Sequence, residues 1–148
     1  MRIFKGRVIA PGTVTAEATV SKQGFNTLAS FQKALQFGDK DATCSDQNND
    51  ELYGKKLAHR ALCLSRTIGS TTGGLVIYGA CSMERNPACM LFSEPIDSLA
   101  AAGAILSDVW LDNVSMPVID QLGDEFLEYV KDDMIITVRE DGTVEVRE

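Results

Sequence analysis

Two short apolar runs in the middle of the chain, separated by a helix-like segment, constrain the fold more than any other feature. Residues 61–64 read Ala-Leu-Cys-Leu, and residues 88–92 read Ala-Cys-Met-Leu-Phe. Strands that are apolar at every position are typical of parallel sheets buried on both faces. Residues 75–81 favour a helix, which would form the crossover that parallel pairing requires. The pattern predicts an α/β domain with parallel central strands.

Both ends of the chain predict antiparallel structure instead. Residues 2–9 and 14–20 alternate between polar and apolar side chains around an Ala-Pro-Gly turn, which predicts an antiparallel pair. Residues 134–138 and 144–147 flank an Asp-Gly turn, a strong hairpin signal. The predicted fold class is therefore α/β, with parallel central strands, crossover helices and an added antiparallel β layer, in a single domain over residues 1–148.

The segment after the second alternating run predicts a helix and then a loop. Asn26 is placed to cap the helix, with Leu28, Phe31 and Leu35 on one face. Residues 39–50 are polar and acidic, and they form the longest irregular stretch of the chain. Long loops in compact domains are often functional, so this loop is a candidate for part of a site.

The second half of the chain predicts two more helices. Glu94-Pro95 begins a helix that runs to about residue 102, where Gly103 is expected to end it. Residues 109–118 predict a strand and a loop, with Trp110 in the core or at an interface. A last helix is expected over residues 123–130.

Composition and charge exclude several classes of partner. The 148 residues carry a net charge of −7, with a pI near 4.7. Binding to nucleic acid or to an anionic membrane surface depends on clustered Lys and Arg, so neither partner is expected. No run approaches the ~20 apolar residues that span a bilayer, and the N-terminus has no apolar signal region, so a cytoplasmic location is predicted.

The cysteines do not predict a metal site in this chain. Cys44, Cys63, Cys81 and Cys89 form no Cys-x-x-Cys pair, and His59 is the single histidine. A closed tetrahedral site needs ligand spacings that this set lacks. Cys63 and Cys89 lie inside apolar runs and are expected in the core. All four cysteines are expected to be reduced thiols, as in other cytoplasmic proteins.

One turn carries candidate chemistry. Residues 69–74 read Gly-Ser-Thr-Thr-Gly-Gly, follow a predicted buried strand and open a predicted helix. Backbone N–H groups and the positive end of the helix dipole should face this turn. Its residues fit three functions: a helix cap, an anion cradle without the P-loop lysine, or a reactive Ser70 whose alkoxide the N–H groups stabilise.

The order of several short motifs resembles the aconitase X small-subunit, or swivel-domain, family. The turn at residues 69–74 looks like the Gly-Ser-[Ser/Thr] active-site turn of that family. The other matching pieces extend over nearly the whole chain; they are residues 6–12, Cys44-Ser45-Asp46 with Gly54, residues 86–90, residues 103–106 and residues 116–120. The resemblance implies a swivelling β/β/α domain that works with a separate large subunit and is inactive alone.

The resemblance also implies a reaction. In aconitases the serine of the matching turn removes the proton α to a carboxylate, so Ser70 is the implied base. An arginine that binds substrate carboxylate follows those serines, whereas Thr72 stands at that place here. Carboxylate binding must then come from turn N–H groups or from the partner. Iron, or an iron–sulfur cluster, is implied in the large subunit, where it would polarise the leaving hydroxyl.

Two substrates are known for the family, and the sequence favours one. Residues 25–31 and 71–74 look more like the branch that dehydrates cis-3-hydroxy-L-proline to pyrroline-2-carboxylate. The alternatives are a phosphomevalonate dehydratase small subunit and a non-catalytic module that binds a small anion. A swivel subunit is also expected to expose an apolar patch to its partner.

The candidate site residues come from the turn and from two other segments. Ser70 is the candidate catalytic residue. The candidates for binding the small carboxylate substrate lie in the turn, at the first helix and in the acidic loop; they are Gly69, Thr71, Thr72, Asn26, Asp46 and Asn48.

Overall fold

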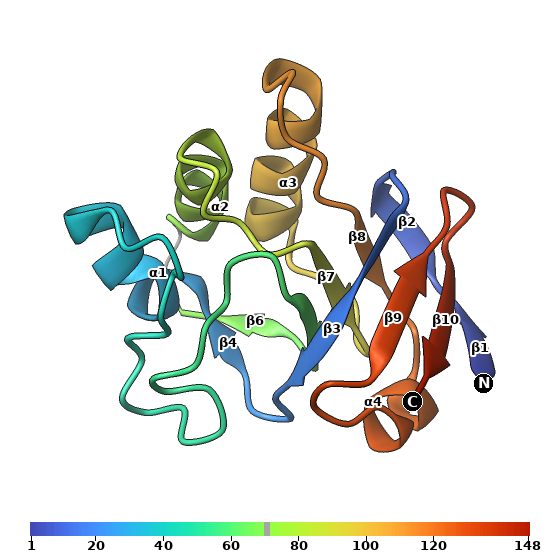
Figure 1. Ribbon diagram of the computed structural model, residues 1–148. Helices are drawn as coiled ribbons and strands as arrows, with labels where there is room; N and C mark the ends of the chain where they lie inside the picture. The colour runs from blue at the N-terminus through green and yellow to red at the C-terminus, as the bar shows by residue number, and fades with distance from the viewer. Residues whose placement is uncertain (70–71) are drawn as a thin grey trace.

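The computed structural model describes residues 1–69 and 72–148, and its main element is a mixed eight-stranded sheet (Figure 1). The four central strands β3, β5, β7 and β8 pair in parallel, and the remaining pairs are antiparallel. In spatial order the strands are β1 (Arg2–Lys5), β10 (Thr143–Arg147), β9 (Ile135–Val138), β3 (Val14–Val20), β5 (Ala61–Leu64), β7 (Cys89–Phe92), β8 (Val118–Asp120) and β2 (Arg7–Ala10). The predicted fold class is confirmed.

Three helices cover one side of the parallel strands, and a short fourth helix lies away from them, near the C-terminus (Figure 1). The helices are α1 (Thr27–Phe37), α2 (Gly73–Ser82), α3 (Ser98–Trp110) and α4 (Asp124–Tyr129). Helix α2 connects β5 to β7 and α3 connects β7 to β8, so both are crossovers between parallel strands. A small parallel pair, β4 (Phe25–Asn26) with β6 (Thr67–Ile68), lies where α1 and α2 begin.

The sheet separates two apolar cores. The first lies between the sheet and helices α1 to α3 and includes Phe25, Phe31 and Phe92. The second lies on the other side, where Phe4 packs edge-on against Phe126 of α4 with ring centroids 5.4 Å apart. Strand β3 joins the two halves of the sheet, because it pairs with antiparallel β9 along its first residues and with parallel β5 along its last.

The early antiparallel pair predicted for residues 2–9 and 14–20 is wrong. The first segment is two strands separated by Gly6, and each finds a partner from the C-terminal half: β1 pairs with β10, and β2 pairs with β8. A side chain at Gly6 would lie 2.3 Å from the Asp120 carbonyl, so the chain can cross there only as glycine. Strands β1 and β2 are the first and the last strand of the sheet order. Because they are joined directly at Gly6, the sheet curls around the second core.

The predicted end of the third helix is also wrong. Helix α3 begins after Asp97, whose side chain accepts a hydrogen bond from the Ala100 N–H, and it continues past Gly103 to Trp110. Gly103 does not end the helix because it is a packing glycine: a Cβ there would lie 2.1 Å from the carbonyl oxygen of Gly74 in α2. Residues 109–118 were predicted to form a strand and a loop. They contain instead the end of α3, a loop and the first residue of β8.

Several side-chain predictions can be compared with observed burial. Cys63 and Cys89 are core residues, as predicted. Leu28 is 40% exposed, because α1 presents Thr27, Ser30, Phe31 and Ala34 to the core instead. Trp110 is excluded from the core, with 64% of its surface exposed. Within the part of the chain that the structure describes, no helix is long and apolar enough to cross a bilayer.

Candidate active site at the start of three helices

A cavity of about 220 Å³ lies where α1, α2 and α3 begin, at the carboxyl edge of the parallel strands. The residues that line it come from β6, from the turn after it and from the first turns of the helices; they are Thr27, Thr67, Ile68, Gly69, Gly73, Asp97 and Leu99. Gly69 and Gly73 bracket the predicted active-site turn. Ser70 and Thr71 lie outside the described residues. Ligands of open α/β sheets bind at this edge, so the cavity is the candidate site.

The pairing of β4 with β6 brings two predicted site residues together. The register places Asn26 opposite Ile68, directly before the turn. Gly69 has φ of +99°, which favours glycine, and a Cβ there would lie 2.8 Å from the Asn26 side-chain nitrogen. Asn26 also caps α1, as predicted, because its Oδ1 accepts a hydrogen bond from the Ala29 N–H at 3.1 Å. Asn26 therefore lies against Gly69, which lines the cavity, although Asn26 itself is not a lining residue.

Two further glycines let the helix starts approach one another. A Cβ at Gly73 would lie 3.0 Å from the Thr27 hydroxyl oxygen of α1, and one at Gly74 would lie 2.2 Å from the Leu99 carbonyl oxygen of α3. A side chain at Gly74 would force α2 and α3 apart, whereas one at Gly73 would crowd the Thr27 hydroxyl. The Gly-Gly end of the turn is therefore explained by packing around the site.

The helix starts create a region suited to negative charge. The N-termini of α1 and α3 are capped by the side chains of Asn26 and Asp97. The N-cap residue of α2, Thr72, makes no such side-chain cap bond, and the first turn of α2 has no acidic residue. The positive end of the α2 dipole is thus not compensated by an acidic side chain of the first turn of that helix. A carboxylate or phosphate would be stabilised there.

Five of the seven residues that line the cavity were missed in the sequence analysis, and Thr67 and Asp97 are the most informative of them. The Thr67 hydroxyl donates a hydrogen bond to the Asp97 carboxylate, whose other oxygen caps α3. An Asp shortly before an apolar helix is an N-cap signal, but only the fold places it across from the turn. Exposed Arg66 also brings a positive charge to the residue just before β6.

Asp46 and Asn48 do not line this cavity. The Asp46 side chain is nearly buried and accepts a hydrogen bond from the Asn48 N–H at 3.0 Å, which forms a local Asx turn. The same acidic loop is fixed to α1 by Ser45, whose hydroxyl donates to the Ala29 carbonyl at 2.5 Å. The structure gives this pair of residues a role in shaping the loop.

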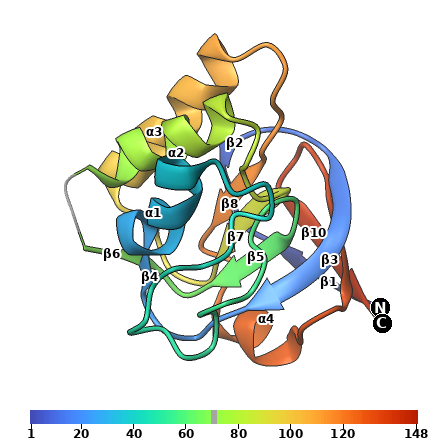
Figure 2. The same cartoon turned by 60° about the vertical axis from the view of Figure 1, so that its left-hand side comes forward.

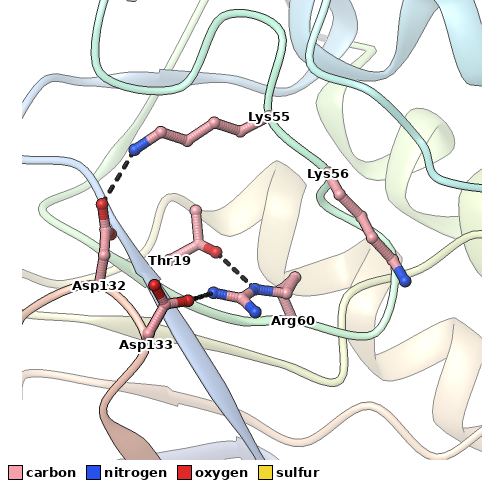
Figure 3. Close-up of a pocket in the computed structure, with 6 residues that line it drawn as sticks. All are labelled: Thr19, Lys55, Lys56, Arg60, Asp132 and Asp133. Carbon is pink, nitrogen blue, oxygen red and sulfur yellow. Dashed lines mark hydrogen bonds and ion pairs between the residues drawn. The ribbon is translucent and has the colours of Figure 1, made fainter.

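A second cavity, of about 280 Å³, lies before β5, at the opposite edge of that strand from the turn (Figure 3). Four of its five charged side chains pair with one another: Lys55 lies 2.9 Å from Asp132, and Arg60 lies 2.7 Å from Asp133. Arg60 also donates to the Thr19 hydroxyl at 2.8 Å. These bonds tie the loop before β5 to β3 and to the turn before β9, so this cavity is a structural junction.

The iron group implied by the resemblance does not fit the described residues of this chain. Across residues 1–69 and 72–148, no three Cys, His, Asp or Glu side chains lie close enough to hold a metal ion. All four cysteines are buried, and burial raises the pKa of each thiol, that of Cys89 to about 12. The thiolate is the form that binds metals, so these thiols are poor ligands.

The family to which the chain belongs is shown by comparison with known families and structures. The family model described as the aconitase X swivel domain matches residues 3–146. The chain belongs to the aconitase X swivel-domain family. The crystal structure of Thermococcus kodakaraensis aconitase X, in its holo form, superposes with a TM-score of 0.81 at 28% identity, and the match covers 100% of both chains. A solution NMR structure of a UPF0107 protein, 24% identical over 99% of this chain and 100% of that one, has the same fold with a TM-score of 0.79.

The sequence relatives of this swivel-domain chain are named for a different substrate from the one that the sequence analysis favoured. The phosphomevalonate dehydratase small subunit of Methanocaldococcus jannaschii is 28% identical over 97% of this chain and 96% of its own length. The protein of the same name from Aeropyrum pernix is 36% identical over 63% of this chain, a match that spans 64% of that protein. These names agree with the alternative substrate of the sequence analysis rather than with hydroxyproline.

Proposed function

We propose that this swivel-domain chain is the small subunit of an aconitase-X-type hydro-lyase, to which it contributes Ser70 as general base. The observation that carries the proposal is the cavity at the start of three helices, which brackets the serine turn in a chain of this family. The large subunit would complete the site, hold the iron or iron–sulfur group and leave this chain inactive alone. Buried free thiols support a reducing, cytoplasmic location.

A serine works as a base only where its alkoxide is stabilised. The N–H groups at the start of α2 and the dipole of that helix supply fixed positive charge at the end of the serine turn, which supports a role for Ser70 as base. Such groups need no reorganisation during the reaction, which is the condition for effective electrostatic stabilisation. Thr71, Thr72, Gly69 and Asn26 remain the proposed substrate contacts of this chain. Asp46 and Asn48 would contribute indirectly, through the shape of their loop.

The proposed step is a β-elimination. Ser70 takes the proton on the carbon α to the substrate carboxylate, and the electron pair of that C–H bond forms a C=C bond. The hydroxyl on the β carbon leaves as hydroxide and takes up a proton from solvent to become water, and Ser70 returns its proton to solvent before the next turnover, so the net products are an unsaturated acid and water. The substrate carboxylate stabilises the charge that develops on the α carbon, and the α2 N-terminus stabilises the carboxylate.

We favour phosphomevalonate as the substrate. Two relatives named phosphomevalonate dehydratase small subunit support it, one of them matched over nearly its whole length. Phosphomevalonate is a 3-hydroxy acid with a phosphate at its other end, so it presents the anionic carboxylate that the helix starts would attract.

A specific observation supports cis-3-hydroxy-L-proline as a second candidate. The Asp97 carboxylate lines the cavity, whereas none of the described residues that line it is a Lys or Arg. A carboxylate is suited to the ring ammonium of a hydroxyproline and would repel a phosphate. Loss of water from this substrate gives an enamine that tautomerises to pyrroline-2-carboxylate.

The two substrates can be separated by one experiment. The chain is co-expressed with a candidate large subunit, and dehydration of each substrate is measured with wild type and Asp97→Asn. We expect turnover of phosphomevalonate by the pair and none by the small chain. Asp97→Asn should change KM for phosphomevalonate less than threefold, since Asn still caps α3. Turnover of hydroxyproline alone, with KM raised tenfold or more in Asp97→Asn, would replace the first substrate by the second.

An assembled, iron-loaded pair that dehydrates neither compound would contradict the proposed function. Binding of inorganic phosphate or proline by the small chain alone, without any turnover by the pair, would instead support the anion-binding module of the sequence analysis.

A further inference from the structure

An apolar groove of about 370 Å³ runs along the outer surface between α2 and α3, which lie side by side in Figures 1 and 2. Its walls are Leu75 and Tyr78 from α2 and Leu99, Leu106 and Trp110 from α3. We refer to these five residues as the α2–α3 face. Leu75 is 72% exposed and Trp110 is 64% exposed, although both are among the most apolar side chains of the chain.

The groove is built by close helix packing. Gly74 and Gly103 form its floor, and their backbones touch where any Cβ would collide. The ring of Trp110 packs edge-on against Tyr78 at 6.2 Å between centroids, which holds both aromatic rings at the rim. The face is therefore a fixed surface, and binding to it would cost little ordering of side chains.

The composition of these two helices is unlike that of a solvent-exposed helix. Helix α2 has no charged residue and the thirteen residues of α3 have one, Asp108. The six residues of α4 have three. Depletion of charge with enrichment of aromatic residues marks the centre of a protein interface. Contiguous exposed apolar surface of this kind is rare on a protein without partners.

The position of the groove indicates what covers it. The α2–α3 face shares Leu99 with the active-site cavity, and Gly74 of its floor follows Gly73 of that cavity. If Ser70 reaches a substrate held by the large subunit, that subunit must contact the rim of the cavity, to which Leu99 contributes a side chain that is 48% exposed. Its surface then continues directly onto the apolar groove.

We infer that the α2–α3 face is the docking surface for the large subunit, which places an apolar ridge or helix into the groove. This inference rests on the proposed function, because it takes the large subunit from there. The face would fix the position of the serine turn over the partner's site, since the glycine contacts link both helices to that turn.

Leu75→Asp tests the inference without harming the fold. Position 75 lies in the first turn of α2, where an acidic residue is favourable to the helix dipole, so the variant should fold as well as wild type. Buried in an apolar interface, the same carboxylate is unfavourable. We expect the affinity for the large subunit to fall at least 100-fold. The matched control is Tyr53→Asp, which places the same charge at a half-exposed loop residue and should change affinity less than threefold.

The single tryptophan of the chain gives a second readout. Labelled with 5-fluorotryptophan, the small chain shows one ¹⁹F resonance, from Trp110. Addition of unlabelled large subunit should shift that resonance and reduce its sensitivity to a soluble paramagnetic agent. Equal affinity of wild type and Leu75→Asp, or an unshifted resonance in a catalytically active pair, would overturn the inference while leaving the proposed function intact.

A second copy of this chain is the competing occupant. A dimer of the small chain that dissociates in Leu75→Asp, and that persists through this face when the large subunit is bound, would also overturn the inference.

Discussion

The two sides of the central sheet end in opposite kinds of surface, although both enclose a well-buried core. On the α4 side, strands β1, β9 and β10 curl around Phe126, and the exposed residues form ion pairs such as Arg139 with Glu145 at 2.9 Å. On the helical side, α2 and α3 expose an apolar face beside the serine turn. The comparison teaches that the first side exposes mainly polar surface, whereas the second exposes the apolar face that we propose the large subunit covers.

The largest expected effect on stability comes from the α4 side. Phe126 is fully buried and packs against Phe4, so Phe126→Ala should lower the free energy of unfolding by about 3–5 kcal/mol. The folded fraction should still bind the large subunit with unchanged affinity. Urea unfolding followed by circular dichroism measures the first quantity, and titration at a temperature where the variant is folded measures the second. Loss of affinity in folded Phe126→Ala would break the proposed division between the two sides.

A smaller effect on stability, with a larger effect on assembly, is expected on the helical side. In Gly103→Ala the new methyl group meets the Gly74 backbone, so α2 and α3 must separate. Such overpacking costs about 1–3 kcal/mol, part of which the better helix propensity of Ala offsets. Because the same separation distorts the groove and the turn, affinity for the large subunit should fall at least tenfold. Ala104→Gly is a control that changes the neighbouring residue in the opposite sense, and it should lower stability while leaving assembly intact.

Features with a local sequence signal could be predicted, whereas features that depend on distant parts of the chain could not. The strands at residues 61–64 and 88–92 and the C-terminal hairpin have local signals, namely continuous apolar runs and an Asp-Gly turn. The partners of β1 and β2 have none, because strands from the far end of the chain replace the nearby one. Local signals therefore predicted where strands lie in the sequence better than they predicted which strands pair.

Glycine shows why the helical side was harder to predict. By sequence alone Gly103 looks like a helix end, but in the fold it is a contact point in the middle of α3. Asp97 and Thr67 are thirty residues apart, and nothing local indicates that they meet across the cavity. The serine turn was predicted from its motif and stays a prediction, whereas Thr67 and Asp97 could be found only from the folded structure.

The central claim is that Ser70 is the base of a site completed by another subunit. It is tested most directly by kcat of the assembled complex at saturating substrate, for Ser70→Ala against Ser82→Ala. The control removes a hydroxyl at the C-terminal end of α2, the helix that follows the serine turn in the chain, where Ser82 donates to the Gly79 carbonyl. Since a general base contributes about 10²–10⁴ in rate, kcat should fall by that factor in Ser70→Ala alone, with assembly unchanged. Equal kcat for both variants and wild type, in complexes of equal stability, would contradict the account.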